Sequence, residues 1–329
     1  MTTILVTGGA GYIGSHVVRQ LGERGERLVT LDNLSTGLRG AVLHGEFVEG
    51  DAGDAELVAK TLAKYRVETV MHFAAHVQVP ESVANPLKYY GNNTANTRTL
   101  LECCVAAGVK HFVFSSTAAV YGIPEGGVAD ETTATVPINP YGWSKFMSEY
   151  MLRDVAAVTP LRYVALRYFN VAGADPGGRI GQSTPEATHL IKVACEHVVG
   201  KRESISVFGT DYDTPDGTCI RDYIHVEDLA AAHLKALDYL RRGGTSTILN
   251  CGYGRGLSVR EVLDEVASVS GYRLQVRESG RRAGDPPRLV AAAVRIRETL
   301  GWIPSHDDLA GIVATALAWE RRLLREPLA

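Results

Sequence analysis

The stretch Ile4-Leu5-Val6-Thr7-Gly8-Gly9-Ala10-Gly11-Tyr12-Ile13-Gly14 decides the fold of this chain of 329 residues. It joins a short apolar run to a glycine-rich loop, and a helical pattern over residues 15–21 follows at once. Such a run is typical of a parallel strand that is buried on both faces. The loop matches Gly-x-Gly-x-x-Gly at Gly9, Gly11 and Gly14, and also Gly-x-x-Gly-x-x-Gly from Gly8. Glycines there allow a tight turn and let backbone N–H groups approach a pyrophosphate, so the stretch predicts a dinucleotide site.

A second strand pattern, over residues 27–31, ends in Asp32, which lies 18 positions after Gly14. An acidic residue at this distance is placed to accept both ribose hydroxyls of an adenine dinucleotide. Its charge would repel a 2′-phosphate, so we predict NAD rather than NADP as the cofactor. The alternative is that Asp32 is an ordinary turn residue in an Asp-Asn pair.

Strands and helices continue to alternate after Asp32. This alternation predicts a doubly wound parallel sheet, an α/β fold. We expect strands over residues 47–51, 69–75, 111–115 and 161–166, and helices over residues 54–65 and 92–107. Ligands of such sheets bind beyond the carboxyl ends of the strands. Those ends carry Asp51, Ala74, Ala75, Ser115, Ser116 and Thr117.

The bulk composition excludes several classes of function. The chain is 45% hydrophobic and 22% charged, and its net charge of −3 is spread without blocks, so nothing indicates a nucleic-acid or membrane partner. Five cysteines without paired metal spacing suggest reduced thiols, and the N-terminus has no signal-peptide pattern, so we expect a cytoplasmic protein. His72 and His76 straddle a strand end with no further ligand residues, so we expect no metal site.

A third stretch, Pro140-Tyr141-Gly142-Trp143-Ser144-Lys145, carries candidate chemistry. Proline suits the first turn of a helix, on which Tyr141 and Lys145 share one face. A lysine ammonium near a phenol favours the phenolate and lowers its pKa, so Tyr141 is a candidate base. Thr117, 24 positions earlier, is a candidate donor to the reacting oxygen. The alternatives are an exposed i, i+4 pair and local hydrogen bonding at a strand end.

These stretches together resemble the extended short-chain dehydrogenase/reductase family. The resemblance rests on Thr7-Gly8-x-x-Gly11-x-x-Gly14, on residues 115–122 and on residues 140–145, and it extends from Ile4 to about Trp319. Within the family the chain most resembles the UDP-glucose 4-epimerases. The resemblance implies an NAD-dependent isomerase that interconverts UDP-galactose and UDP-glucose through a 4-keto sugar, with Tyr141, Lys145 and Thr117 as catalytic residues.

Two small residues after Thr117 distinguish this chain from related subfamilies. Dehydratases and decarboxylases place acids there, whereas this chain has Ala118 and Ala119, which cannot move a proton. Oxidation followed only by return of the hydride leaves epimerisation as the simplest outcome. Two alternatives stay open: a 4-epimerase of UDP-pentoses such as UDP-xylose and UDP-arabinose, and a non-catalytic protein that senses NAD.

The resemblance also implies the binding residues. The cofactor set is Gly8, Gly11, Tyr12, Ile13, Gly14, Asp32, Asn33, Ser35, Thr36, Gly37, Asp51, Ala52, Phe73, Ala74, Ala75, Asn92, Ser115, Tyr141, Lys145, Tyr168 and Phe169. The UDP-sugar set is Thr117, Tyr141, Asn170, Thr188, His189, Leu190, Phe208, Arg221, Arg282, Asp285 and Leu289. Arginines suit a diphosphate through their forked donors, and an aromatic ring suits a uracil.

Two positions depart from the family pattern. Val77 stands where some members have a lysine, which puts one cofactor contact in doubt. Leu289 stands where a bulky tyrosine restricts some members to unmodified hexoses. A smaller residue leaves room beside C2 of the sugar, so we expect UDP-N-acetylhexosamines to be accepted as well.

The second half of the chain reads as a smaller α/β substrate-binding region. We expect an NAD-binding Rossmann domain over residues 1–170, completed by strands from the second half, and a UDP-sugar region over residues 171–329. Glycine and proline cluster over residues 173–181 and 209–217, which predicts loops that cap the substrate. Helical patterns cover residues 228–242, 259–271 and 309–324. The resemblance implies a homodimer joined through the helices that follow Pro86 and Pro140.

Overall fold

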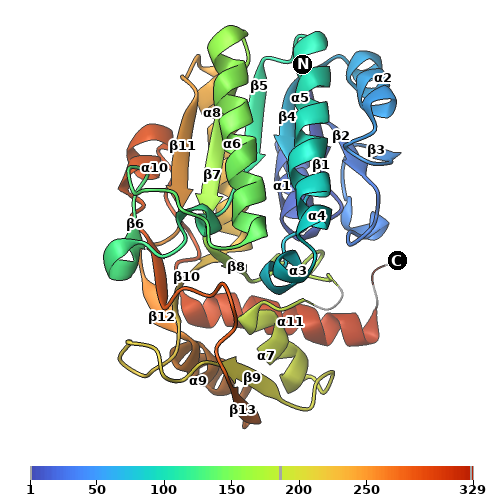
Figure 1. The fold of residues 1–329 in the computed structure, drawn as a ribbon. Helices are drawn as coiled ribbons and strands as arrows, with labels where there is room; N and C mark the ends of the chain where they lie inside the picture. The colour runs from blue at the N-terminus through green and yellow to red at the C-terminus, as the bar shows by residue number, and fades with distance from the viewer. Residues whose placement is uncertain (1, 185–186, 327, 329) are drawn as a thin grey trace.

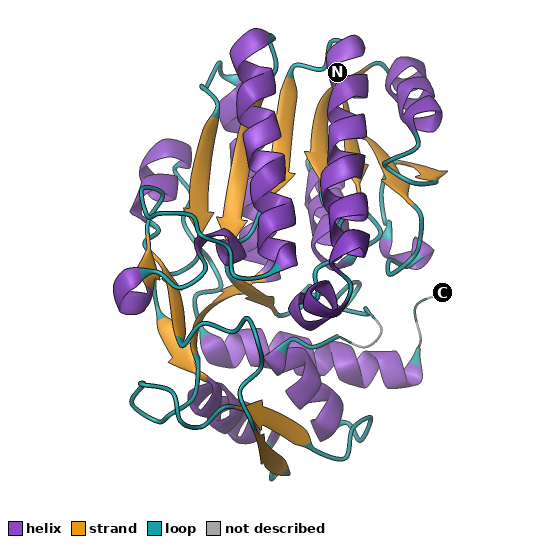
Figure 2. Ribbon diagram, in the orientation of Figure 1, coloured by secondary structure: helices purple, strands orange, loops and turns teal. Residues whose placement is uncertain are grey.

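Seven parallel strands form the central sheet of the protein, in a computed structural model that describes residues 2–184, 187–326 and 328. Their order across the sheet is β11, β7, β5, β4, β1, β2, β3. Their bounds are Thr3–Thr7 (β1), Arg27–Asp32 (β2), Glu46–Glu49 (β3), Val67–His72 (β4), His111–Ser115 (β5), Arg162–Tyr168 (β7) and Thr247–Cys251 (β11). The carboxyl ends of the strands all point to one edge, toward the smaller region of the molecule (Figures 1 and 2).

Helices cover both faces of this sheet, as the apolar runs of its strands require. Successive strand residues point to opposite faces, so Ile4 and Val6 enter one core cluster and Leu5 enters the other. The helices α1 (Tyr12–Glu23) and α8 (Val226–Arg241) pack on the first face. The helices α2 (Ala55–Tyr65), α5 (Asn96–Ala106) and α6 (Pro140–Val158) pack on the second, with α5 and α6 in front in Figure 1.

The smaller region is built on a second, mixed sheet. Its strand order is β12, β10, β14, β6, and β8 also pairs with β10. The bounds are Val128–Ala129 (β6), Asn170–Ala172 (β8), Ile220–His225 (β10), Gly256–Ser258 (β12) and Arg288–Ala291 (β14). A two-stranded parallel sheet joins Ile205–Phe208 (β9) to Val276–Ser279 (β13). The accompanying helices are Leu190–Val198 (α7), Val259–Ser270 (α9), Val294–Leu300 (α10) and Leu309–Arg325 (α11).

Several short helical segments connect the longer elements. After β4 come Val79–Ala84 (α3), Pro86–Tyr89 (α4) and a π-helical turn over Tyr90–Ala95 (η2), which continues into α5. Three short 3₁₀ turns cover Arg39–Ala41 (η1), Ala118–Tyr121 (η3) and Glu125–Gly127 (η4). No helix in the described part of the chain is long and apolar enough to span a bilayer.

The sequence predicted the fold class and most elements correctly, and it was wrong in detail for three of the predicted elements. The strand expected over residues 69–75 begins at Val67 and ends at His72, because its partner β1 ends at Thr7. The strand expected over 47–51 likewise ends at Glu49, opposite Asp32. The helix expected over 92–107 begins as a π-helical turn. The stretches 173–181 and 209–217 lie outside the helices and strands, as predicted, whereas the strands β8, β9, β10, β12, β13 and β14 of the smaller region were not predicted from the sequence.

Candidate active site

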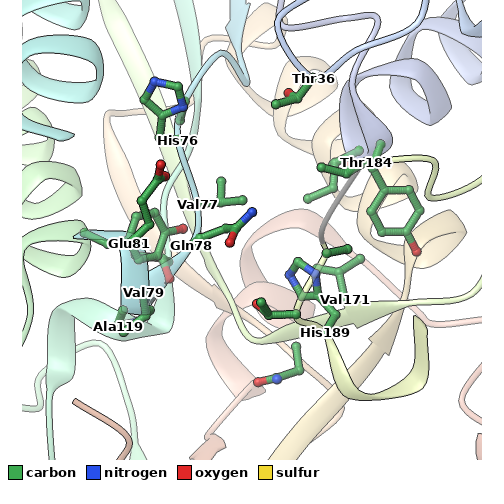
Figure 3. Close-up of a pocket in the computed structure, with 18 of the residues that line it drawn as sticks. Thr36, His76, Val77, Gln78, Val79, Glu81, Ala119, Val171, Thr184 and His189 are labelled. Atoms are coloured by element: carbon green, nitrogen blue, oxygen red, sulfur yellow. Dashed lines mark hydrogen bonds between the residues drawn. The ribbon is translucent and has the colours of Figure 1, made fainter. Parts of the chain in front are cut away.

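A cavity of about 980 Å³ runs along the carboxyl edge of the seven-stranded sheet and into the smaller region. One wall carries Val77, Gln78 and Glu81, and the facing wall carries Thr184 and His189 (Figure 3). The crevice beyond the strand ends is where ligands of doubly wound folds bind. The cavity therefore lies where the sequence predicts a ligand.

The glycine loop at one end of the cavity has no room for side chains. Gly8 has a φ of +72°, and a Cβ there would lie 2.5 Å from the backbone nitrogen of Ala74. A Cβ on Gly14 would lie 2.2 Å from the Gly8 carbonyl oxygen. Gly11 is the N-cap of α1 and has no side chain to bond the first turn. The first N–H groups of α1 are thus left for an anionic ligand.

Asp32 at the end of β2 has a fixed carboxylate. Oδ2 accepts a hydrogen bond of 2.9 Å from the Ala10 N–H, and Oδ1 accepts one of 2.9 Å from the Leu34 N–H. Burial raises the pKa of Asp32, and the two N–H groups oppose that rise. Each carboxylate oxygen keeps a second acceptor site, so Asp32 can still receive two ribose hydroxyls.

Asp51 organises the loops beside Asp32. Its Oδ2 accepts a bond of 2.8 Å from the Asn33 amide, and its Oδ1 accepts bonds from the Gly53 N–H at 2.7 Å and the Asn96 amide at 2.9 Å. Gly37 packs behind the glycine loop, where a Cβ would lie 2.8 Å from the carbonyl carbon of Ala10.

Tyr141 and Thr117 line the cavity, and Lys145 lies buried one helical turn after Tyr141 on α6. Asn139 caps α6 by accepting a bond of 2.8 Å from the Gly142 N–H, which fixes the start of the helix. Lys145 Nζ donates a bond of 2.9 Å to the Ser115 carbonyl oxygen. All three side chains are buried. The face-sharing pair predicted from sequence is thus docked on the end of β5 rather than exposed.

In the protein alone the pKa of Tyr141 is raised, although a lysine ammonium near the phenol was expected to lower it. Burial raises the pKa of Tyr141, and the opposing contribution is the Thr117 hydrogen bond. Burial also lowers the pKa of Lys145 to about 7, so its positive charge is itself weakened near neutral pH. The spacing in sequence could not reveal this, because it says nothing about how deeply both groups are buried.

The far end of the cavity combines two arginines with an aromatic ring. The Arg282 guanidinium carbon lies 4.4 Å from the centroid of the Phe208 ring. Arg282 Nε donates to Asp285 at 3.0 Å, and Arg221 lies 3.8 Å from the same carboxylate. Asp285 thus holds both cations at one place, as recognition of a diphosphate requires.

The structure brings nearly all the predicted residues to this one cavity. Two of them do not line it: Gly37 lies behind the loop, and Lys145 is covered by its neighbours. Sequence reasoning missed several lining residues, namely His76, Gln78, Val79, Glu81, Lys88, Ile138, Asn139, Val171, Gln182, Thr184, Arg202, Ser204, Ser206, Cys219, Tyr223 and Pro286. They come from short helices, turns and strands without a motif, so no signal could have found them. The exceptions are Cys219 and Tyr223, which lie beside Arg221 in the predicted block.

No metal centre is present among the residues that the structure describes. They contain no group of three or more histidine, cysteine or acidic side chains with the geometry of a cation site. All five cysteines are free.

Comparison with known proteins gives concordant matches. Residues 4–252 match the model of the NAD dependent epimerase/dehydratase family. A UDP-glucose 4-epimerase of Azospirillum brasilense is 61% identical over 321 residues, which are 97% of this chain and 92% of that protein. A crystal structure of UDP-glucose 4-epimerase from Brucella ovis in complex with NAD matches with a TM-score of 0.93 and 45% identity, over 96% of this chain and 98% of that chain. The UDP-Glc/GlcNAc 4-epimerase of Campylobacter jejuni matches with a TM-score of 0.85 and 48% identity, over 98% and 100% of the two chains.

Proposed function

Because the chain belongs to the NAD dependent epimerase/dehydratase family, we propose that it is an isomerase that uses NAD to interconvert UDP-galactose and UDP-glucose. One observation carries this proposal. A single cavity joins the glycine loop, the Tyr141–Thr117 pair and the cluster of Arg221, Arg282 and Phe208. A cofactor, a reacting sugar and a nucleotide diphosphate therefore each have a matching place in one continuous site.

The residues at the sheet edge fit NAD. Gly8 and Gly14 leave space that a Cβ would fill, the N-terminus of α1 offers free N–H groups, and Asp32 offers two carboxylate oxygens to a ribose. When bound, NAD supplies the group that takes a hydride from C4 of the sugar and gives it back. The remaining steps belong to side chains of the chain.

Tyr141 is the proposed acid and base of the reaction. It takes the proton from the C4 hydroxyl as C4 is oxidised, and it returns the proton when C4 is reduced. Its raised pKa opposes the first step in the free protein. The positive charges of Lys145 and of an oxidised nicotinamide would favour the phenolate. Thr117 hydrogen-bonds the same substrate oxygen.

The cavity also supports a reaction in which the configuration at C4 is inverted while the sugar stays bound. Arg221, Arg282 and Phe208 would anchor the UDP portion, and this remote binding energy keeps the 4-keto sugar in place while it turns over. Ala118 and Ala119 beside Thr117 offer no second acid for elimination or decarboxylation. Return of the hydride is then the reaction that remains.

Leu289 bears on the range of substrates. It lies on β14, opposite Arg221 of β10, and its side chain lines the cavity. A leucine leaves more room than a tyrosine would, so UDP-N-acetylhexosamines are proposed as further substrates. The likeness to an epimerase named for both UDP-Glc and UDP-GlcNAc supports this.

Three further statements belong to the proposal. The protein is a homodimer, in which a second copy covers the exposed apolar side chains of α6. It is cytoplasmic, in keeping with its free thiols. Residues 1–170 are the NAD-binding unit, with α8 and β11 contributed from the second half, and residues 171–329 are the UDP-sugar unit.

The test is turnover by the purified protein with no NAD added. UDP-galactose is supplied first, with UDP-N-acetylglucosamine and UDP-xylose in parallel, and each product is separated by chromatography. The expected result is conversion of UDP-galactose to UDP-glucose, because the cofactor stays bound between turnovers. Preference for UDP-xylose would favour the pentose alternative. No turnover of any substrate with excess NAD would contradict the proposal and favour a non-catalytic NAD-binding protein.

A further inference from the structure

Glu149 lies on α6 one helical turn beyond Lys145, and the proposed chemistry gives it no role. Tyr141, Lys145 and Glu149 are four residues apart in turn, so they share one face of the helix. The Glu149 side chain is 2% exposed. A carboxylate buried to this degree requires charged or polar partners.

Two side chains hold the Glu149 carboxylate, one on β7 and one directly after β5. Arg167 on β7 donates from Nε to Oε1 at 2.9 Å and from Nη2 to Oε2 at 2.6 Å. The Ser116 hydroxyl donates to Oε1 at 2.5 Å. Arg167 itself lies 4.9 Å from the centroid of the Tyr121 ring. A bidentate pair with a third donor fixes the carboxylate in orientation as well as in position.

Ser116 stands between two residues that touch the proposed chemistry. On one side, the Ser115 carbonyl oxygen accepts the Lys145 hydrogen bond at 2.9 Å. On the other side, Thr117 lines the cavity together with Tyr141. The bond from Ser116 to Glu149 therefore ties the end of β5 to the helix that carries both Tyr141 and Lys145. Misplacement of reacting groups by about 1 Å can cost about a hundredfold in rate.

Glu149 also determines the charge around Lys145. Glu149 on α6 and His72 on β4 are coupled by charge to Lys145. Arg167 on β7 pairs with Glu149, and Tyr168 follows Arg167 on that strand. Burial lowers the pKa of His72 to about 3 and raises the pKa of Tyr168, so both are neutral near pH 7. Burial lowers the pKa of Lys145 to about 7, and the charge of Glu149 opposes that fall. Within this group Glu149 is the one anion beside two cations.

We infer that Glu149 is a positioning residue for the proposed reaction: bonded to Ser116 and Arg167, it holds residues 115–117 against α6 and keeps Lys145 charged beside Tyr141. The inference rests on the proposed function. Glu149 is therefore proposed to act in two ways. Its hydrogen bond to Ser116 holds the segment after β5 against α6, and this bond is the tether. Its negative charge keeps Lys145 protonated, and Ser116 has no part in this second effect.

Two variants separate these effects. Glu149→Gln keeps the shape and one acceptor oxygen but removes the charge, whereas Ser116→Ala removes the tether and leaves the charge. The rate kcat and the KM for UDP-galactose are measured from about pH 6 to about pH 10 for both variants and the unchanged protein. Glu149→Gln should lower kcat about tenfold or more, with KM nearly unchanged, and move the alkaline fall of kcat to lower pH by about one unit. Ser116→Ala should lower kcat and leave the position of the alkaline fall unchanged.

A second readout does not depend on turnover. Nuclear magnetic resonance of protein labelled at the lysine side chains, with Lys145→Met to assign the signal, follows the titration of Lys145 directly. Its midpoint should fall in Glu149→Gln and stay in place in Ser116→Ala.

The possible failures are distinguishable. If the unchanged protein is active, and Glu149→Gln has the same pH profile and the same Lys145 midpoint, the inference is overturned but the proposed function is not. A Ser116→Ala variant with unchanged kcat would overturn the tether even if Glu149→Gln did not fold. An unchanged protein without activity would overturn the proposed function and the inference with it.

Discussion

At the scale of single residues, the site depends on a few groups whose surroundings change their chemistry. Tyr141 is a phenol with a raised pKa and Lys145 is an amine with a pKa lowered to about 7, and burial is the first cause of both shifts. The position of the two residues on α6 does not by itself give either of them a pKa suited to catalysis. Their function depends on Thr117, on the segment after β5 and on the cofactor charge.

The first prediction at this scale concerns the proposed base. Tyr141→Phe removes the group that moves the C4 proton, so kcat for UDP-galactose should fall about a hundredfold or more, within the usual range for general acid–base catalysis. The NAD content of the purified variant should match that of the unchanged protein, which absorbance after denaturation measures. Tyr239→Phe on α8, which lies outside the cavity, is the matched control. A Tyr141→Phe variant with more than about a tenth of the normal rate would mean that another residue is the base.

The second prediction concerns the glycine loop. Gly8→Ala forces a positive φ on a residue with a Cβ and pushes that Cβ to 2.5 Å from the Ala74 nitrogen. The variant should lose bound NAD, and its free energy of unfolding should fall by about 1 kcal/mol or more. Gly91→Ala is the control, since a Cβ there meets nothing within 4 Å. Calorimetry of NAD binding and urea unfolding provide the measurements. Full NAD binding by Gly8→Ala would exclude this loop as the cofactor cradle.

At the scale of elements, the sequence pattern predicted those helices, strands and turns whose formation depends mainly on neighbouring residues. The run over β1, the glycine loop and α1 has matching strand, turn and helix signals, and the structure has these elements in that order. Helix α1 is longer at both ends than the predicted pattern over residues 15–21. The π-helical turn over Tyr90–Ala95 does not, because bonds from Asn93 to the His76 backbone and to the Ser144 hydroxyl hold it from outside. The second sheet was missed because its strands are short and pair across long distances, such as Val290 with Val128.

The same reasoning separates the predictable part of the site from the rest. Gly14, Asp32 and Tyr141 belong to motifs whose spacing has a physical reason, and they line the cavity as expected. Arg202 and Gln182 also line it, but they reach it from turns whose course depends on the packing of the smaller region. No periodicity in sequence encodes such a position.

Two buried histidines, on α1 and α8, make the stability of the protein depend on pH. Burial lowers the pKa of His16 on α1 and of His233 on α8 to about 4, below their ordinary value of about 6.5. Between these values the unfolded chain binds more protons than the folded chain, so stability falls as the pH falls through this window. At pH 5 each histidine should cost about 2 kcal/mol relative to pH 7.

Urea unfolding of His233→Phe at both pH values checks this dependence. The variant should lose less stability on acidification than the unchanged protein, by about 2 kcal/mol. The comparison between variants matters because other groups titrate nearby, among them Asp222, whose pKa burial raises to about 6. Equal losses in the two proteins would mean that His233 is not buried in the neutral form.

At the scale of the whole molecule, one face of α6 has no partner among the residues that the structure describes. Trp143, Met147 and Tyr150 are exposed on this helix, and Leu87 on the adjoining α4 is 79% exposed. Apolar side chains grouped in this way are typical of a protein–protein interface. A second copy of the chain, packed helix to helix, would cover them in the proposed homodimer.

Light scattering tests the proposed dimer. The unchanged protein should have about twice the chain mass of 35.5 kDa. Met147→Glu places a charge in the covered face and should give a protein of the single-chain mass at micromolar concentration. Ile303→Glu, at an exposed site after α10, should leave the dimer intact. A single-chain mass for the unchanged protein would contradict the dimer but not the chemistry of the cavity.

The most direct test of the central claim uses UDP-galactose that carries deuterium at C4, incubated with the purified protein in ordinary water with no NAD added. If one bound cofactor takes the hydride from C4 and returns it to the opposite face, the UDP-glucose formed should keep its deuterium at C4. Mass spectrometry and nuclear magnetic resonance of the product locate the label. Loss of the deuterium to water during epimerisation would contradict a closed exchange between the sugar and the cofactor held by the glycine loop.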